Sequence, residues 1–119
     1  MPDDHEVSNV TTGNLEILER VREAAAQKIL YLPHAVTQMS RPGRLISVAE
    51  VRDAVFFGEI IEEYPEDARG HSCLMLGAGE GARPLHVVCS PKDVFLAIIT
   101  AYVPSLREWR NDFRTRIKL

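Results

Sequence analysis

The fold is indicated by residues 83–102, which read RPLHVVCSPKDVFLAIITAY. Residues 85–89 and 94–102 are rich in β-branched and aromatic side chains, and they flank the turn-forming sequence SPKD at 90–93. This pattern predicts a β-hairpin with a short connection. Because the second run is almost wholly apolar, we expect it to be a central strand covered on both faces.

Three residues interrupt the apolar character of this hairpin: His86, Thr100 and Tyr102. If Cys89 pairs with Val94, His86 lies on one face of the hairpin and the other two lie on the opposite face, unless a bulge shifts the register. A histidine in such a strand has two interpretations. It is either a functional group or a core residue that is hydrogen-bonded to the backbone.

Outward from the hairpin, the preceding chain predicts two more strands and a well-marked helix. Ser47 and Glu50 have the spacing of a capping box, and Gly58 stands where a helix ends, so we expect a helix over residues 48–57. Strands are expected over 59–64 and 71–76, with a glycine-rich connection over 77–81. These glycines lead into another strand and not into a helix, which argues against a phosphate-binding loop.

The N-terminal part of the chain predicts further helices. We expect residues 1–13 to be a flexible tail and residues 14–28 to be a helix capped by Asn14. Residues 29–32 are either the end of that helix or a brief strand. Pro33 suits the first turn of a new helix over 34–39.

At the other end, Ser105 and Glu108 form a second capping-box pattern, which predicts a helix to about residue 116. The expected fold is therefore α+β, with N-terminal helices, a four-stranded and mainly antiparallel sheet and a C-terminal helix, in a single domain over 14–119.

The composition is that of an ordinary globular domain of 119 residues, with 45% hydrophobic and 26% charged residues. No apolar run approaches the roughly 20 residues that a membrane span requires, and the N-terminus is acidic where a secretory signal is basic. We therefore expect a cytoplasmic protein without a membrane partner. The two cysteines, Cys73 and Cys89, are expected to be buried thiols.

The segment after Pro33 has the residues that metal-free RNA cleavage needs. His34 can shuttle a proton near neutral pH, and the guanidinium groups of Arg41 and Arg44 can bind phosphate in two-pronged fashion. A proton shuttle and stabilisers of negative charge are the minimum set for this reaction. The alternative is that His34 serves as a capping or packing group.

Other features bear on ligands and partners. The four histidines, together with the cysteines, show no spacing typical of a metal site, and we expect no cofactor. A net charge of −3 argues against a uniformly RNA-binding surface, but the basic residues Arg107, Arg110 and Arg114 crowd the end of the chain. They are candidates for contacts with RNA or with an acidic partner, and the alternative is a solvated charged face.

Several segments together resemble a family of small bacterial proteins known only as uncharacterised domain 4258. The segments are PHAVTQM with the arginines that come after it, GEIIEEYPEDARGHSCLMLG, RPLHVV, ITAYVP and WRNDFR. The resemblance covers about residues 29–116. The spacing between Met39 and Ile46 departs from the family's usual pattern, so both Arg41 and Arg44 remain candidates for its arginine.

This resemblance implies a fold similar to RelE-type and barnase-like ribonuclease toxins. It also implies a metal-independent endoribonuclease that a small antitoxin-like protein holds inactive. Carried onto this sequence, the family's residues fall on His34, Arg41 or Arg44, His86, the Thr-x-Tyr pair Thr100 and Tyr102, and Trp109. The leading hypothesis is thus a toxin-type endoribonuclease that uses the RNA's own 2′-hydroxyl. The alternative is a non-enzymatic protein-interaction module.

Overall fold

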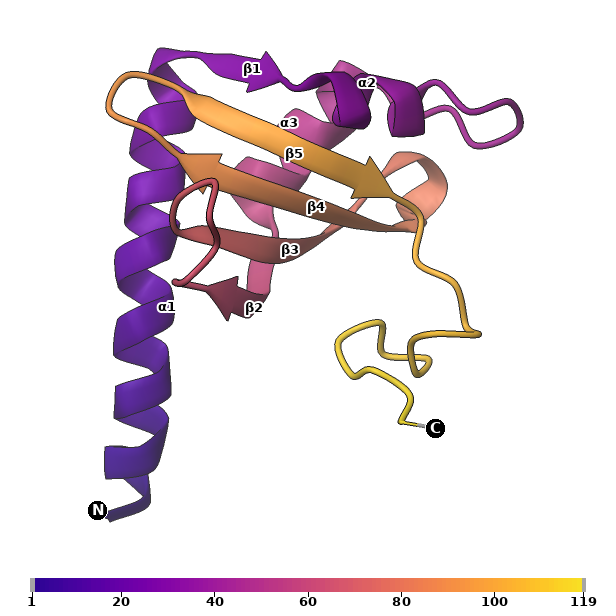
Figure 1. Ribbon diagram of the computed structural model, residues 1–119. Helices are drawn as coiled ribbons and strands as arrows, with labels where there is room; N and C mark the ends of the chain where they lie inside the picture. The colour runs from indigo at the N-terminus through magenta and orange to yellow at the C-terminus, as the bar shows by residue number, and fades with distance from the viewer. Residues whose placement is uncertain (1, 119) are drawn as a thin grey trace.

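The computed structural model describes the backbone of residues 2–118 and the side chains of residues 15–118 (Figure 1). Its elements, in chain order, are α1 (Pro2–Gln27), β1 (Ile29–Tyr31), α2 (Pro33–Met39), α3 (Val48–Phe57), β2 (Glu59–Tyr64), β3 (Ser72–Ala78), the short 3₁₀ helix η1 (Glu80–Ala82), β4 (Pro84–Pro91) and β5 (Leu96–Tyr102).

The strands form one mixed sheet in the order β1-β5-β4-β3-β2. Strands β2 to β5 are an antiparallel meander, as expected, but β1 adds a fifth strand that pairs parallel with β5. The expectation of four strands was wrong, because residues 29–31 form a strand of their own. This strand pairs with β5, which lies far along the chain, so that Leu30 is opposite Ala97. The α+β class is confirmed.

Helices α1 and α3 cover one face of the sheet, and α3 passes behind it in Figure 1. The helix predicted to begin at Asn14 begins at Pro2, so α1 includes most of the segment expected as a tail. Its buried residues recur at intervals of three or four and pack into the core with α3 and with alternate residues of β3, β4 and β5. They are Ile17, Val21, Ala24 and Ala25.

Helix α3 has the bounds that its capping box predicts. The Ser47 hydroxyl accepts from the Glu50 N–H at 3.1 Å, and the Ser47 N–H donates to the Glu50 carboxylate at 2.9 Å. Val51 and Val55 are buried, whereas Val48 is exposed and takes no part in the core. A reciprocal cap satisfies two backbone groups within four residues, so this helix start depends little on the rest of the fold.

The β4–β5 hairpin differs from its predicted register. Its connection closes between Lys92 and Phe95, and Cys89 lies opposite Ile98 rather than Val94. A bulge next to Cys89 shifts the strands so that His86 lies opposite Tyr102. These two side chains therefore share a face of the sheet.

The predicted C-terminal helix is absent. Residues 103–118, here called the C-terminal segment, form a turn at Ser105 and then double back, with an isolated bridge between Trp109 and Arg116. The guanidinium groups of Arg114 and Arg116 bond to the carboxylates of Glu59 and Glu62 on β2. A continuous helix could not bring both arginines to this strand while keeping Trp109 buried, so tertiary contacts override the local signal.

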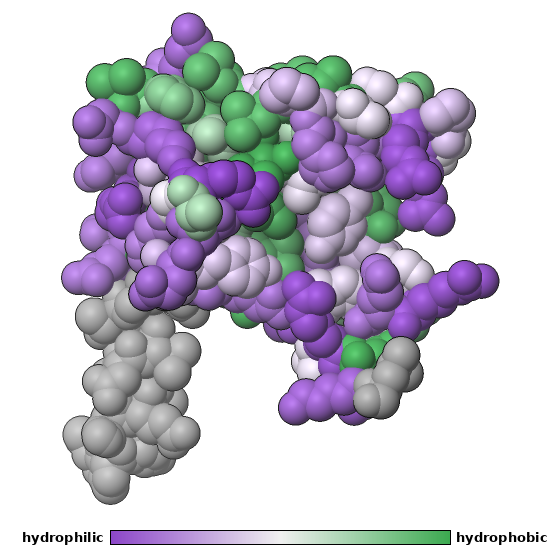
Figure 2. All heavy atoms as spheres, in the orientation of Figure 1, coloured by the Kyte–Doolittle hydropathy of each residue, from purple (hydrophilic) through white to green (hydrophobic). Residues whose placement is uncertain are grey.

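The C-terminal segment lies on the face of the sheet that α1 and α3 leave uncovered. Side chains alternate along a strand, so the residues between the core positions of β3 and β4 point to this second face. Leu74, His86 and Trp109 are buried there. In Figure 2 hydrophobic residues form a band across this side, bordered by hydrophilic ones.

Candidate functional site

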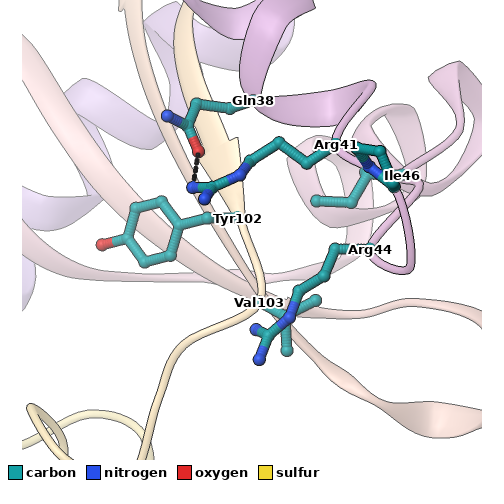
Figure 3. A pocket seen from close by; sticks show the side chains of 7 residues that line it. Gln38, Arg41, Arg44, Ile46, Tyr102 and Val103 are labelled. Carbon is teal, nitrogen blue, oxygen red and sulfur yellow. Dashed lines mark hydrogen bonds between the residues drawn. The ribbon is translucent and has the colours of Figure 1, made fainter.

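A cavity of about 380 Å³ lies where the loop after α2 meets the end of β5 (Figure 3). It is lined by Gln38, Arg41, Pro42, Arg44, Ile46, Tyr102 and Val103. Among residues 15–118 no carboxylate lines it, whereas two arginines do, so the cavity favours an anion. The guanidinium group is well suited to a phosphate because its planar fork can donate two parallel hydrogen bonds.

The loop that carries the two arginines is short and anchored at both ends. The Ile46 N–H donates to the Met39 carbonyl at 2.9 Å, which brings the chain back to the end of α2. Gly43 at the tip has a φ of 77°, a conformation that glycine adopts without cost. Arg83, from the β3–β4 connection, donates to the Leu45 carbonyl at 2.5 Å. These contacts hold Arg41 and Arg44 over the end of β5.

The two arginines have different surroundings. Arg41 donates to the amide oxygen of Gln38 at 3.3 Å, and Figure 3 shows its guanidinium group between Gln38 and Tyr102. Arg44 reaches the other side of Val103, and within residues 15–118 its guanidinium group has no hydrogen-bond acceptor. Both side chains are exposed, so a ligand in the cavity can reach them.

Tyr102 connects the cavity with the buried part of the second face. Its hydroxyl lies 3.2 Å from Nδ1 of His86, and Nε2 of His86 lies 2.8 Å from the carbonyl oxygen of Phe113. His86 is fully buried, and Trp109 meets its ring edge-on with centroids 4.5 Å apart. Burial lowers the pKa of His86, against a smaller opposing effect of the bond to Phe113, and burial raises the pKa of Tyr102. Both side chains are therefore neutral near pH 7.

His34 lies outside this cavity lining. It is exposed on the first turn of α2, four residues before Gln38. Residues four apart share a helix face, so His34 lies about 6 Å along the helix axis from Gln38. The structure thus brings Arg41, Arg44 and Tyr102 together, places His86 behind Tyr102, and leaves His34 at the margin.

The basic residues near the end of the chain divide into two kinds. Arg114 is bonded to Glu59, so it already neutralises a carboxylate. Arg107 and Arg110 are exposed, and their side chains have no hydrogen-bond partner among residues 15–118. All three candidates for contacts with RNA or a partner are exposed, but among residues 15–118 only Arg114 is engaged in an ion pair.

Two residues that shape the cavity were missed from the sequence. Gln38 comes one helical turn after His34 and three residues before Arg41. Residues at this spacing lie close together on a helix, so the sequence already indicated that Gln38 can contact Arg41. Arg83 reaches Leu45 across 38 residues of sequence, and no local pattern indicates that contact.

Other types of site receive no support from the part of the chain with described side chains. Among residues 15–118, no three His, Cys, Asp or Glu side chains come close enough together to hold a metal ion. Within the described chain, none of the helices combines the length and the apolar character needed to cross a bilayer.

Comparison with known proteins places the chain in a family. No curated protein matches it, and neither does any solved structure. The family described as "Domain of unknown function (DUF4258)" matches residues 31–103. This range is more than half of the chain. It includes α2, the loop that carries Arg41 and Arg44, strands β2 to β5 and every residue that lines the cavity. The chain therefore belongs to the DUF4258 family.

Proposed function

We propose that this protein is a toxin-type endoribonuclease that cleaves RNA without a metal ion. The observation that carries the proposal is the cavity itself, whose lining includes Arg41, Arg44 and Tyr102 and, among the residues with described side chains, no carboxylate. Such a lining suits the phosphodiester group of RNA, which is anionic and presents several acceptor oxygens.

The reaction would use the RNA's own 2′-hydroxyl. This oxygen attacks the adjacent phosphorus, the P–O5′ bond breaks, and the products are a 2′,3′-cyclic phosphate and a 5′-hydroxyl end. Negative charge grows on the phosphorane oxygens, and the two guanidinium groups stabilise it. His34, on the same helix face as Gln38, serves as acid or base for a reacting oxygen of the phosphodiester at the α2 edge of the cavity.

The fold and the family resemblance support the same proposal. The family resemblance implies helices and an antiparallel sheet, as in RelE-type and barnase-like ribonuclease toxins, and the helices on one face of the β2–β5 meander are compatible with that expectation. That resemblance implies an antitoxin-like protein partner and action in the cytoplasm, where the RNA substrate is. The protein carries a net charge of −3, so RNA binding depends on a local basic surface at Arg41 and Arg44, extended by Arg107 and Arg110.

The test is to induce the wild-type protein in bacteria beside the variant Arg41→Ala/Arg44→Ala. We expect growth arrest and RNA fragments with 5′-hydroxyl ends from the wild type, and normal growth with intact RNA from the variant. Arg52→Ala is the matched control, since Arg52 is an exposed arginine on α3 that contacts Phe56. A His34→Ala variant tests the proton shuttle, and unchanged cleavage would remove His34 from the mechanism.

A second candidate function is a non-enzymatic protein-interaction module. It is favoured by an apolar surface away from the cavity, where the Phe57 side chain is 83% exposed beside a hollow of about 520 Å³. Leu15, Leu18, Phe56 and Ile60 line that hollow with it. If soluble wild-type protein leaves both RNA and growth intact, this candidate replaces the nuclease.

A further inference from the structure

Tyr102, whose side chain lines the cavity, hydrogen-bonds through its hydroxyl to a buried imidazole. The Phe113 carbonyl can only accept, so the His86 nitrogen 2.8 Å away, Nε2, must carry the hydrogen. In a neutral imidazole the other nitrogen, Nδ1, then has a free lone pair. The Tyr102 hydroxyl, 3.2 Å from Nδ1, is its donor. The backbone of the C-terminal segment thus sets the tautomer that makes His86 a proton acceptor.

This arrangement is held by a strained backbone. Phe113 has a φ of 57°, in the left-handed region that bulky residues rarely adopt. Such a conformation persists only where the surroundings enforce it, and it is concentrated at functional sites. Here the bonds of Arg114 to Glu59 and of Arg116 to Glu62 fix the chain directly after the strained residue.

The charges around His86 leave it neutral but able to accept a proton. Glu62 on β2 favours the protonated ring, and Arg116 on the C-terminal segment opposes it. These two groups are bonded to each other at 2.8 Å, so their fields largely cancel. Tyr102 on β5 and Trp109 complete the surroundings with uncharged groups. Proton transfer into this site therefore forms a buried imidazolium with both N–H groups already facing oxygen acceptors.

We propose that His86 takes up the proton released in RNA cleavage, through Tyr102, and that the C-terminal segment makes it competent to do so. This inference rests on the proposed ribonuclease activity. As the 2′-oxygen forms its bond to phosphorus, its proton passes to the Tyr102 oxygen, and the hydroxyl proton of Tyr102 passes to Nδ1 of His86. The departing O5′ then takes a proton from His34, whose role becomes that of the acid. His86 is a positioning and relay residue, because it acts only through Tyr102.

The competing interpretation is that His86 is a core residue that only supports the fold. The two interpretations differ in what Tyr102→Phe and His86→Gln do to purified protein acting on a single-stranded RNA oligonucleotide. The relay predicts that each variant lowers kcat about 100-fold with little change in KM, since the arginines that bind phosphate remain. The double variant should be no slower than either single one, because the two groups work as a unit.

The pH profile and the tautomer provide readouts that a structural role would not give. In a plot of kcat against pH, the wild-type value should decrease at low pH, where His86 becomes protonated and can no longer accept a proton. This decrease should be absent in both single variants. In protein labelled with ¹⁵N-histidine, His86 should show a protonated Nε2 and an unprotonated Nδ1, identified by its absence in His86→Gln. Tyr102→Phe removes one hydroxyl from a half-buried ring, so it remains a valid test if His86→Gln fails to fold.

The outcomes separate the two proposals. If the wild type and Tyr102→Phe cleave RNA equally fast, the proton relay is excluded but the proposed nuclease activity is retained. A wild type that does not cleave RNA overturns the nuclease and the relay with it. A His86 whose hydrogen resides on Nδ1 overturns the relay whatever the activity. A 100-fold loss of kcat in Tyr102→Phe, without the decrease at low pH, supports it.

Discussion

The carboxylate of Glu50 and the guanidinium group of Arg83 join the start of α3 to the β3–β4 connection. Their Oε1–Nη2 and Oε2–Nε distances are 2.9 and 3.1 Å. Glu50 also accepts from the backbone N–H groups of Ser47 and Glu80, at 2.9 and 2.7 Å. Arg83 in turn bonds to the Leu45 carbonyl, so this one carboxylate indirectly holds the loop that carries the cavity's arginines.

The first prediction concerns the acid stability of this contact. Burial alone would raise the pKa of Glu50, but the bonds from Arg83, Ser47 and Glu80 outweigh it and hold the pKa at about 2, below its usual 4.5. The bonded carboxylate therefore stabilises the fold fully above about pH 4.5. That contribution, about 3 kcal/mol, should be lost as the pH falls toward 2.

Urea unfolding at several pH values measures this effect. Glu50→Gln should be less stable than the wild type near pH 7, and the difference should shrink between pH 4.5 and 2. The matched control is Glu66→Gln, a change at an exposed loop residue, which should behave as the wild type does. A constant difference across this range would contradict the prediction.

The second prediction concerns the close approach of α3 to β3. A Cβ added at Gly77 would lie 2.5 Å from the Cβ of Ala54, much closer than carbon atoms pack. Gly77→Ala should therefore lower the free energy of unfolding by about 1–3 kcal/mol. Adding Ala54→Gly should not recover that loss, because the backbone Cα of Ala54 would still lie 2.6 Å from the added Cβ. If the single variant is as stable as the wild type, α3 does not pack this closely.

The third prediction concerns the two cysteines, which lie opposite each other on β3 and β4 with their sulfur atoms 4.0 Å apart. The bond to the Cys73 thiol, together with complete burial, raises the pKa of Cys89 well above its usual value. The reactive species is the thiolate, so native protein should react with a thiol reagent about 1,000-fold more slowly than denatured protein. Rapid modification of native protein near pH 8 would contradict this.

The fourth prediction concerns electrostatic binding of RNA. Each arginine that neutralises a phosphate should contribute about 0.7 to the slope of log affinity against log salt for a single strand. Arg41→Ala and Arg44→Ala should each reduce the slope by that amount, as measured by fluorescence anisotropy with a labelled oligonucleotide. Arg52→Ala, on the exposed side of α3, should leave it unchanged. Equal slopes in all four proteins would exclude the cavity as the RNA site.

Local signals in the sequence predicted local structure well. The helix Val48–Phe57 has the predicted bounds because Ser47 and Glu50 cap it within one turn. The same signal failed at Ser105 and Glu108, where only a turn forms. The two segments differ in their distant contacts, because Arg114 and Arg116 have carboxylate partners on β2 that no capping box can indicate.

The site was predictable in its residue types and less so in its geometry. Arg41, Arg44 and Tyr102 were candidates from the sequence, and they line one cavity. The alignment of His86 with Tyr102 depends on a bulge next to Cys89, which moves one strand by a residue relative to the other. No composition signal marks that bulge, since neither a glycine nor a proline lies among the paired residues Val88, Cys89, Ile98 and Thr100.

The parallel pairing of β1 with β5 determines when, during synthesis, the sheet and the cavity can be completed. Ile29 lies opposite Leu96, so the edge strand emerges from the ribosome long before its neighbour exists. The cavity has the same division, because its arginines precede β2 whereas Tyr102 ends β5. A nascent chain that stops short of Tyr102 carries both guanidinium groups but no complete site. Synthesis itself therefore leaves the cavity open on one side until the last strand is in place.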